Sequence, residues 1–112
     1  MAGPMDIADW RKKIDEIDLK LVKLLNERAR MAQEIGRLKR NTQMPIYEPE
    51  REKTILENIR RENHGPLPHE ELARIFERMI DVMRKLQKDE MLAEQSKSKR
   101  AGGTEFDVEV ND

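Results

Sequence analysis

Basic side chains interrupt a long apolar row near the start of the sequence. Apolar residues from Ile7 to Leu38 follow one another in alternating steps of three and four, and Arg28 occupies one position of this row. Lys39 follows the row directly. A guanidinium group binds carboxylate or phosphate in a bidentate manner, and a plain helical seam has no need of one. We therefore expect these cations to bind an anion.

Helical geometry limits how the cations can combine. Arg28 and Lys39 are eleven residues apart, which returns them to nearly the same helical face, roughly 16 Å apart along the axis. Two long side chains reaching toward each other would leave a gap that fits a small dianion. Arg11 lies about 25 Å from Arg28 and about 42 Å from Lys39 on one straight helix. If Arg11 serves the same site, it must come from a second chain.

A neutral amide lies on another predicted apolar face. Gln87 continues the row Phe76, Ile80 and Met83 in steps of four, three and four, and burial of an unpaired amide is unfavourable by on the order of 1–3 kcal/mol. Arg28 and Gln87 could instead specify the register of a helical seam. Other polar residues beside the apolar faces could be ordinary surface ion-pair partners; these are Arg11, Lys39, Arg51 and Glu52.

The long row predicts a first helix that begins at a cap on Asp6 or Asp9 and runs to about Arg40. The polar stretch 41–45 ends in proline and stops the helix. Gly36, inside this helix, is either a tolerated weak position or a point where another backbone approaches closely.

Two further helices are predicted from their proline starts. Pro49 opens a short second helix that reaches about Asn63, and Pro68 opens a third, medium helix that reaches about Leu92 or beyond. After a lead over residues 1–5, we expect one all-α domain over 6–95. Residues 96–112 read as a flexible linker with an acidic tail, where alternating residues allow either a disordered segment or a docking strand.

The length of the first helix predicts the assembly. About 33 residues make a rod of roughly 50 Å, whereas a compact domain of about 100 residues has a radius of gyration near 13 Å. Two shorter helices cannot cover the apolar face of such a rod along its length. We therefore expect an intertwined, all-helical homodimer.

Composition excludes several classes of function. The chain has 112 residues, no cysteine and a net charge of −1, so nothing points to a disulfide framework, a thiolate metal site or nucleic-acid binding. His64 and His69 flank a Gly-Pro turn, which disfavours a metal centre. No run is apolar enough for a membrane span and the first residues do not form a signal peptide. We expect a cytoplasmic protein.

Several short runs agree jointly, in residue type and in spacing, with one family. They are Trp10-Arg11-Lys12-Lys13-Ile14-Asp15, Glu27-Arg28, Glu34-Ile35-Gly36-Arg37-Leu38-Lys39, Pro45-Ile46 and Glu50-Arg51-Glu52. Over about residues 6–92 the sequence resembles the all-helical, intertwined-dimer class of chorismate mutase. The resemblance implies chorismate, a dicarboxylate, as the substrate and a homodimer as the active form.

Site roles follow from the resemblance for the basic residues. The family counterparts of Arg28, and of Arg11 from the partner chain, hold the two carboxylates of chorismate. Lys39 would bind a carboxylate and the ether oxygen of the bond that breaks.

The remaining roles fall on acidic and neutral residues. The resemblance implies that Gln87 donates a second hydrogen bond to the ether oxygen and that Glu52 takes the ring hydroxyl. Glu48 would help through its backbone, although the family usually has an aspartate there, and Arg51 would shape the pocket. Met83 stands where some members have a small polar residue that touches a carboxylate, so that contact is not expected here.

The implied reaction fits these residue types. Conversion of chorismate to prephenate, a step toward phenylalanine and tyrosine, is a [3,3] rearrangement that requires no nucleophile, metal or cofactor. The protein must hold the substrate in a chair-like pose and stabilise charge on the ether oxygen. Two alternatives stay open: an isochorismate-pyruvate lyase on the same fold, and a non-catalytic helical dimer that senses a metabolite.

Overall fold

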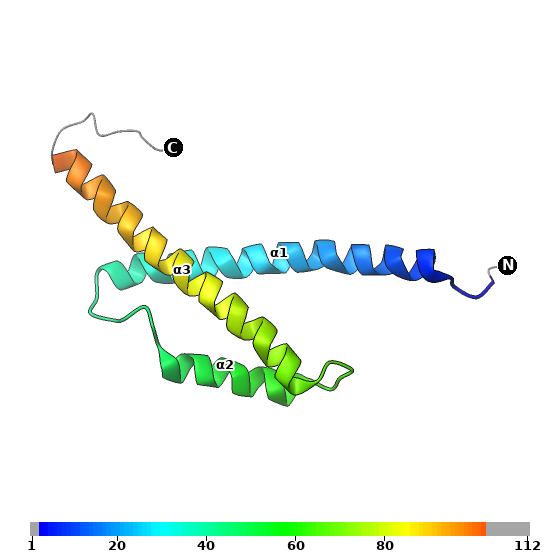
Figure 1. Ribbon diagram of the computed structural model, residues 1–112. Helices are drawn as coiled ribbons and strands as arrows, with labels where there is room; N and C mark the ends of the chain where they lie inside the picture. The colour runs from blue at the N-terminus through cyan, green and yellow to red at the C-terminus, as the bar shows by residue number, and fades with distance from the viewer. Residues whose placement is uncertain (1–2, 103–112) are drawn as a thin grey trace. The chain divides into compact units, whose positions relative to one another are not determined.

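The computed structural model describes residues 3–102 and shows three helices joined by two loops (Figure 1). They are α1 (Ile7–Arg40), α2 (Pro49–Glu62) and α3 (His69–Gly102). No strand occurs among these residues, so the predicted all-α class is confirmed. The chain divides into an N-terminal unit up to Met31 and a C-terminal unit from Ala32, each described here by itself.

Helix α1 begins directly after Asp6, one of the two aspartates predicted as its cap, and Asp9 completes a reciprocal cap. The backbone N–H of Asp9 donates to Asp6 Oδ1 at 2.9 Å, and the backbone N–H of Asp6 donates to Asp9 Oδ2 at 3.1 Å. The carboxylates satisfy amide groups that have no partner inside the helix. At the other end, Thr42 Oγ1 donates to the carbonyl of Lys39 at 3.2 Å, and the chain turns away over the stretch that ends in Pro45.

The N-terminal unit consists of the first part of α1 and exposes an apolar row. Between 49% and 67% of the surface of each of its members is exposed in the single chain. The members are Ile7, Trp10, Ile14, Ile17, Leu21 and Leu24. Nothing in this unit by itself removes the row from solvent.

The C-terminal unit holds the small core of the chain. Ala32, Ile80 and Met83 are buried, and α2 packs against α3. Gly36 explains how α1 meets α3 here, because a Cβ on this residue would lie 2.9 Å from the carbonyl oxygen of Gln87 and 3.0 Å from its Cα. Close approach of another backbone is therefore the correct interpretation of this glycine.

Helix α2 begins at the predicted proline, and α3 begins one residue after the predicted Pro68. Pro49 occupies the first turn of α2, and the backbone N–H of Leu72 donates to the carbonyl of Pro68 at 3.0 Å at the start of α3. Between these helices, Asn63 stabilises the loop by accepting from the Gly65 N–H at 3.0 Å and donating to the Leu67 carbonyl at 2.9 Å.

Helix α3 is longer than the sequence predicted. It runs to Gly102 and is as long as α1, so residues 96–102 are helical where a flexible linker was expected. Serine, lysine and arginine are compatible with a helix, and no proline or glycine interrupts the stretch before residue 102. The rest of the predicted tail, 103–112, lies outside the described residues. None of the described helices combines the length and hydropathy that a bilayer span requires.

Candidate active site

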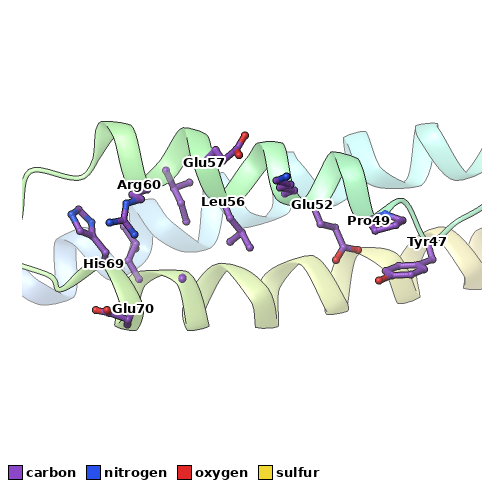
Figure 2. Close-up of a pocket in the computed structure, with 12 residues that line it drawn as sticks. Tyr47, Pro49, Glu52, Leu56, Glu57, Arg60, His69 and Glu70 are labelled. Carbon is purple, nitrogen blue, oxygen red and sulfur yellow. The ribbon is translucent and has the colours of Figure 1, made fainter.

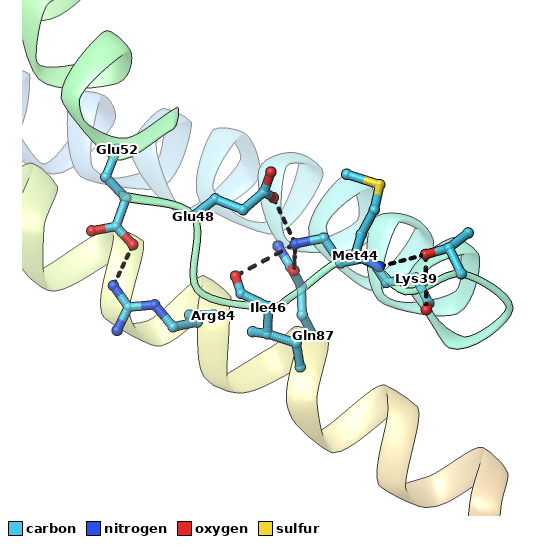
Figure 3. Close-up of polar contacts among 8 residues, drawn as sticks. Lys39, Met44, Ile46, Glu48, Glu52, Arg84 and Gln87 are labelled. Carbon is cyan, nitrogen blue, oxygen red and sulfur yellow. Dashed lines mark hydrogen bonds and ion pairs between the residues drawn. The ribbon is translucent and has the colours of Figure 1, made fainter. Parts of the chain in front are cut away.

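Lys39 is a buried cation of the C-terminal unit, with only 3% of its surface exposed. Its Nζ lies 2.7 Å from Glu48 Oε2, 3.1 Å from Gln87 Oε1 and 3.4 Å from the carbonyl oxygen of Ile46 (Figure 3). An ammonium group has three N–H donors. Each donor of Lys39 thus has an acceptor, which accounts for the burial of a charge that would otherwise be strongly unfavourable.

Three segments bring these groups together. Lys39 lies in the last turn of α1, one turn after Gly36, so both residues face α3. The loop after α1 turns back and brings Ile46 and Glu48 to the ammonium group, and α3 supplies Gln87. The close contact at Gly36 therefore sets the distance at which Lys39 and Gln87 meet.

The Lys39 contact fixes the orientation of the Gln87 amide. An ammonium group can only donate, so Gln87 must present its carbonyl Oε1 to Nζ. The Nε2 group is then directed away from Lys39 and keeps its N–H donors for another acceptor. The Lys39 and Gln87 side chains, from different helices, thus lie side by side.

A second ion pair lies beside the Lys39 cluster. Arg84 on α3 donates from Nη2 to Glu52 Oε2 on α2 (Figure 3), and its Nη1 lies 3.2 Å from Asp81 Oδ1. The centre of the guanidinium lies 5.0 Å from the centroid of the Tyr47 ring, within the range of a cation–π contact. The hydrogen bond to Glu52 raises the pKa of Arg84 above its ordinary value, and partial burial acts in the opposite direction.

The structure brings some predicted site residues together. Lys39, Glu48 and Gln87 form one cluster, and Glu52 lies next to it through Arg84. Glu48 contacts Lys39 through its side chain, in addition to any backbone role. Met83 is buried in the core, with 6% of its surface exposed.

The other predicted cations are described on their own elements. Arg51 is exposed on α2. Arg11 and Arg28 belong to the N-terminal unit, where Arg11 is exposed and Arg28 is half-buried.

Sequence reasoning missed Arg84. In a chain with 40% charged residues, one more arginine on an exposed helix carries little signal. Its position did contain a hint, because Arg84 precedes Gln87 by three residues and therefore shares its helical face.

A pocket of about 460 Å³ lies between α2 and α3 (Figure 2). It is lined by Tyr47, Glu52 and Leu56 among others, but neither Lys39 nor Gln87 reaches it. The pocket and the polar cluster therefore meet only around Tyr47 and Glu52. We assign the candidate active site to the polar cluster, because convergent donors are found there.

Comparison with known proteins identifies the family. The sequence matches chorismate mutase type II over residues 10–88, and the chain belongs to this family. It is 38% identical over 95 residues to the chorismate mutase of Methanocaldococcus jannaschii, with 84% of this chain and 96% of that protein covered. The fold agrees with a structure of chorismate mutase (Form II) from Thermus thermophilus, with a TM-score of 0.72, 35% identity, and coverage of 73% of this chain and 93% of that one.

Other relatives are longer proteins. The bifunctional chorismate mutase/prephenate dehydratase of Aquifex aeolicus is 40% identical over 87 residues, which cover 74% of this chain but 24% of that protein. The corresponding protein of Pseudomonas aeruginosa is 41% identical over 85 residues, which cover 71% of this chain and 23% of that protein. The chain thus spans about a quarter of the length of these bifunctional relatives.

Proposed function

We propose that this chain is a chorismate mutase that converts chorismate to prephenate, with residues 6–95 as the catalytic domain. The observation that carries the proposal is the contact between two side chains that can both donate, in which Lys39 Nζ lies 3.1 Å from the carbonyl Oε1 of Gln87. Membership of the chorismate mutase type II family supports the choice of substrate.

The donor pair suits the charge that develops in the reaction. As the ether C–O bond of chorismate stretches, negative charge grows on its oxygen, and the transition state gains more from nearby donors than the substrate does. Lys39 supplies an ammonium N–H and Gln87 supplies an amide N–H from Nε2. Once these groups have turned to the bound substrate, their N–H donors lie in place before the charge appears.

Substrate binding requires one exchange of partners at Lys39. Its donors already have acceptors on Glu48, Gln87 and Ile46, so a carboxylate or ether oxygen of chorismate must replace one of them. Glu48 is the group to be displaced, because its side chain is about one-third exposed and its carboxylate carries the same sign of charge as the substrate.

We extend the proposal to a homodimer in which sites are shared. The exposed apolar row of the N-terminal unit supports pairing with a second copy, since a row of this length is normally covered. Arg28 and the partner chain's copy of Arg11 would hold the two carboxylates of chorismate, and Arg51 would shape the substrate site around them. Glu52 would accept the hydrogen bond of the ring hydroxyl.

Turnover of chorismate tests the function. We expect the purified protein to consume chorismate, measured by its absorbance, and to form prephenate. Lys39→Ala should lower kcat roughly 100- to 1,000-fold, as loss of one oxyanion-type donor does elsewhere. Lys85→Ala is the matched control, because Lys85 is exposed on α3 and should leave kcat unchanged.

Three results would contradict the proposal. Absence of chorismate turnover by the unaltered protein would remove the function, and full activity of Lys39→Ala would remove the assigned role of that residue. Faster release of pyruvate from isochorismate than formation of prephenate from chorismate would make the protein a lyase. Circular dichroism of Lys39→Ala shows whether the variant retains its helices.

A further inference from the structure

Arg84 joins three segments of the C-terminal unit through one guanidinium group. It pairs with Glu52 on α2 (Figure 3). It also pairs with Asp81 one turn earlier on α3 and lies against the ring of Tyr47 in the loop before α2. Figure 2 shows that Tyr47 and Glu52 border the same end of the neighbouring pocket. A planar group held at both Nη atoms and over one face has little freedom to rotate.

The ion pair between Arg84 and Glu52 uses one of the two carboxylate oxygens of Glu52. Arg84 occupies Oε2, so a carboxylate with two oxygens can still accept through Oε1. Only 25% of the Glu52 side chain and 31% of the Arg84 side chain are exposed. The contact is therefore more than a fully solvated surface ion pair, and it restricts where the second oxygen of Glu52 can point.

We propose that Arg84 is a positioning residue for Glu52, which it holds so that Oε1 accepts the ring hydroxyl of the substrate. The inference rests on the proposed function, because it assigns the means by which one part of that substrate is recognised. Tyr47 acts through Arg84 in turn, by limiting the rotation of its guanidinium.

Arg84 also balances charge beside the donor pair. Glu48, the N-cap of α2, and Glu52, in its first turn, are four positions apart. Lys39 pairs with Glu48, and Arg84, which also pairs with Asp81, neutralises Glu52. Without Arg84, the three remaining groups, one cation and two carboxylates, would carry a net charge of −1. A dianionic substrate would then meet like charge at the position where its hydroxyl must bind.

Kinetics of four variants separate this role from a general structural one. The variants are Arg84→Met, Arg84→Lys, Glu52→Gln and the double variant Arg84→Met with Glu52→Gln. Arg84→Met keeps much of the side-chain length but removes the charge and donors. We expect it to raise the KM for chorismate about tenfold while kcat changes less than about twofold, because the hydroxyl contact is made equally in substrate and transition state.

The double variant carries the decisive comparison. If Arg84 acts through Glu52, Arg84→Met should change KM by less than about twofold once Glu52→Gln is present, a clear departure from additivity. Arg84→Lys should recover part of the loss, because it keeps the charge but not the planar fork. Arg74→Met is the matched control: Arg74 pairs with Glu71 at 2.5 Å on the exposed surface of the same helix and should leave KM unchanged.

Each other outcome overturns the inference. Equal losses in the presence and absence of Glu52→Gln would show that Arg84 acts independently of Glu52, and an unchanged KM in Arg84→Met would show that it does not act at all. If Arg84→Met fails to fold, Tyr47→Leu replaces it. We expect Tyr47→Leu to raise the KM for chorismate by less than about tenfold, and this increase should vanish when Glu52→Gln is also present. An unchanged KM in Tyr47→Leu would count against the positioning role.

Failure of the proposed function can be distinguished from failure of the role assigned to Arg84. Absence of chorismate turnover by the unaltered protein overturns the proposed function, and the dissociation constant for chorismate, measured by calorimetry, then takes the place of KM in the same four-variant comparison. Absence of both turnover and binding overturns the function and the inference together.

Discussion

At the scale of single residues, the site depends on which atoms have their hydrogen bonds already satisfied. Lys39 has three acceptors, and its contact with Gln87 leaves the amide Nε2 as the donor that can turn to a ligand. A neutral amide donates at every ordinary pH, whereas a carboxyl group donates only when it is protonated. The identity of residue 87 should therefore control the pH dependence of turnover.

We expect Gln87→Glu to shift activity toward acid. At low pH the new carboxyl group is protonated and can donate to the ether oxygen; as pH rises through its pKa the group becomes an anion, and the donor is lost. The kcat should be highest at the acid end of a profile measured from about pH 4 to about pH 9 and fall steadily above it. Gln43→Glu, in the exposed loop after α1, adds the same charge away from the site and should leave the profile as it is. A flat profile for Gln87→Glu would contradict the role of the amide.

Glu48 is expected to compete with the substrate for Lys39. Glu48→Gln removes a like charge beside a dianionic ligand and weakens the partner that must be displaced, so KM should fall by about two- to fivefold. The same change leaves the buried ammonium without its counter-ion and should lower the free energy of unfolding by about 1–3 kcal/mol. Steady-state kinetics and urea unfolding measure the two effects. Glu50→Gln, exposed on the same turn, should change neither, and a raised KM in Glu48→Gln would contradict the displacement.

Sequence reasoning reached part of this residue-scale description. Lys39 and Gln87 were identifiable because polar groups beside or within apolar helical rows need a partner. Arg84 and the side-chain role of Glu48 were not identifiable, because both look like ordinary charged surface residues until the fold places α2 and the loop before it against α3. A contact between distant segments has no local signature in the sequence.

At the scale of elements, Gly36 controls the distance between α1 and α3 within the C-terminal unit. We expect Gly36→Ala to be destabilising by about 1–3 kcal/mol, because the added methyl group would meet the backbone of Gln87 at 2.9–3.0 Å. The gain in helix propensity, about 1 kcal/mol, acts in the opposite direction but does not remove a clash with backbone. Displacement of Gln87 from Lys39 should also lower kcat.

Urea unfolding and kcat together test this prediction. Gly3→Ala is the control, because a Cβ at Gly3 meets no atom within 4 Å and should affect neither quantity. A Gly36→Ala protein that is more stable than the unaltered chain, with unchanged kcat, would show that helix propensity outweighs the contact and that the approach of α1 to α3 is not restrictive.

Element boundaries were more predictable than element lengths. Asp6, Pro49 and Pro68 act locally, through capping and through the loss of a backbone donor, so their effect can be read from a few residues. The end of α3 depends on a stretch of serine, lysine and arginine that neither favours nor forbids a helix, and no local signal placed it at Gly102.

At the scale of the whole molecule, one chain carries an exposed apolar row and a separate set of cations. The row in the N-terminal unit supports a homodimer, and the helical rise between Arg11 and Lys39 is the reason for assigning Arg11 to the site of the partner chain. In such an arrangement each active site requires residues from both subunits. Two inactive chains with different defects can then complement each other.

We expect Arg11→Ala and Lys39→Ala homodimers each to lose most of their activity and a mixture of the two to recover part of it. In a hybrid dimer, one site receives both altered residues and the other receives neither, so one of the two sites should work. With equal amounts and random exchange about half of the dimers are hybrids, and the mixture should reach about one quarter of the activity of the unaltered protein. Subunit exchange is followed by mass spectrometry of chains with different tags. The control is a mixture of Lys39→Ala with Gln87→Ala. It should recover no activity, because one chain supplies both residues to a given site and every hybrid site therefore keeps one defect. Exchange without any recovery of activity would place Arg11 outside the shared site, and a monomer in analytical ultracentrifugation would contradict the dimer itself.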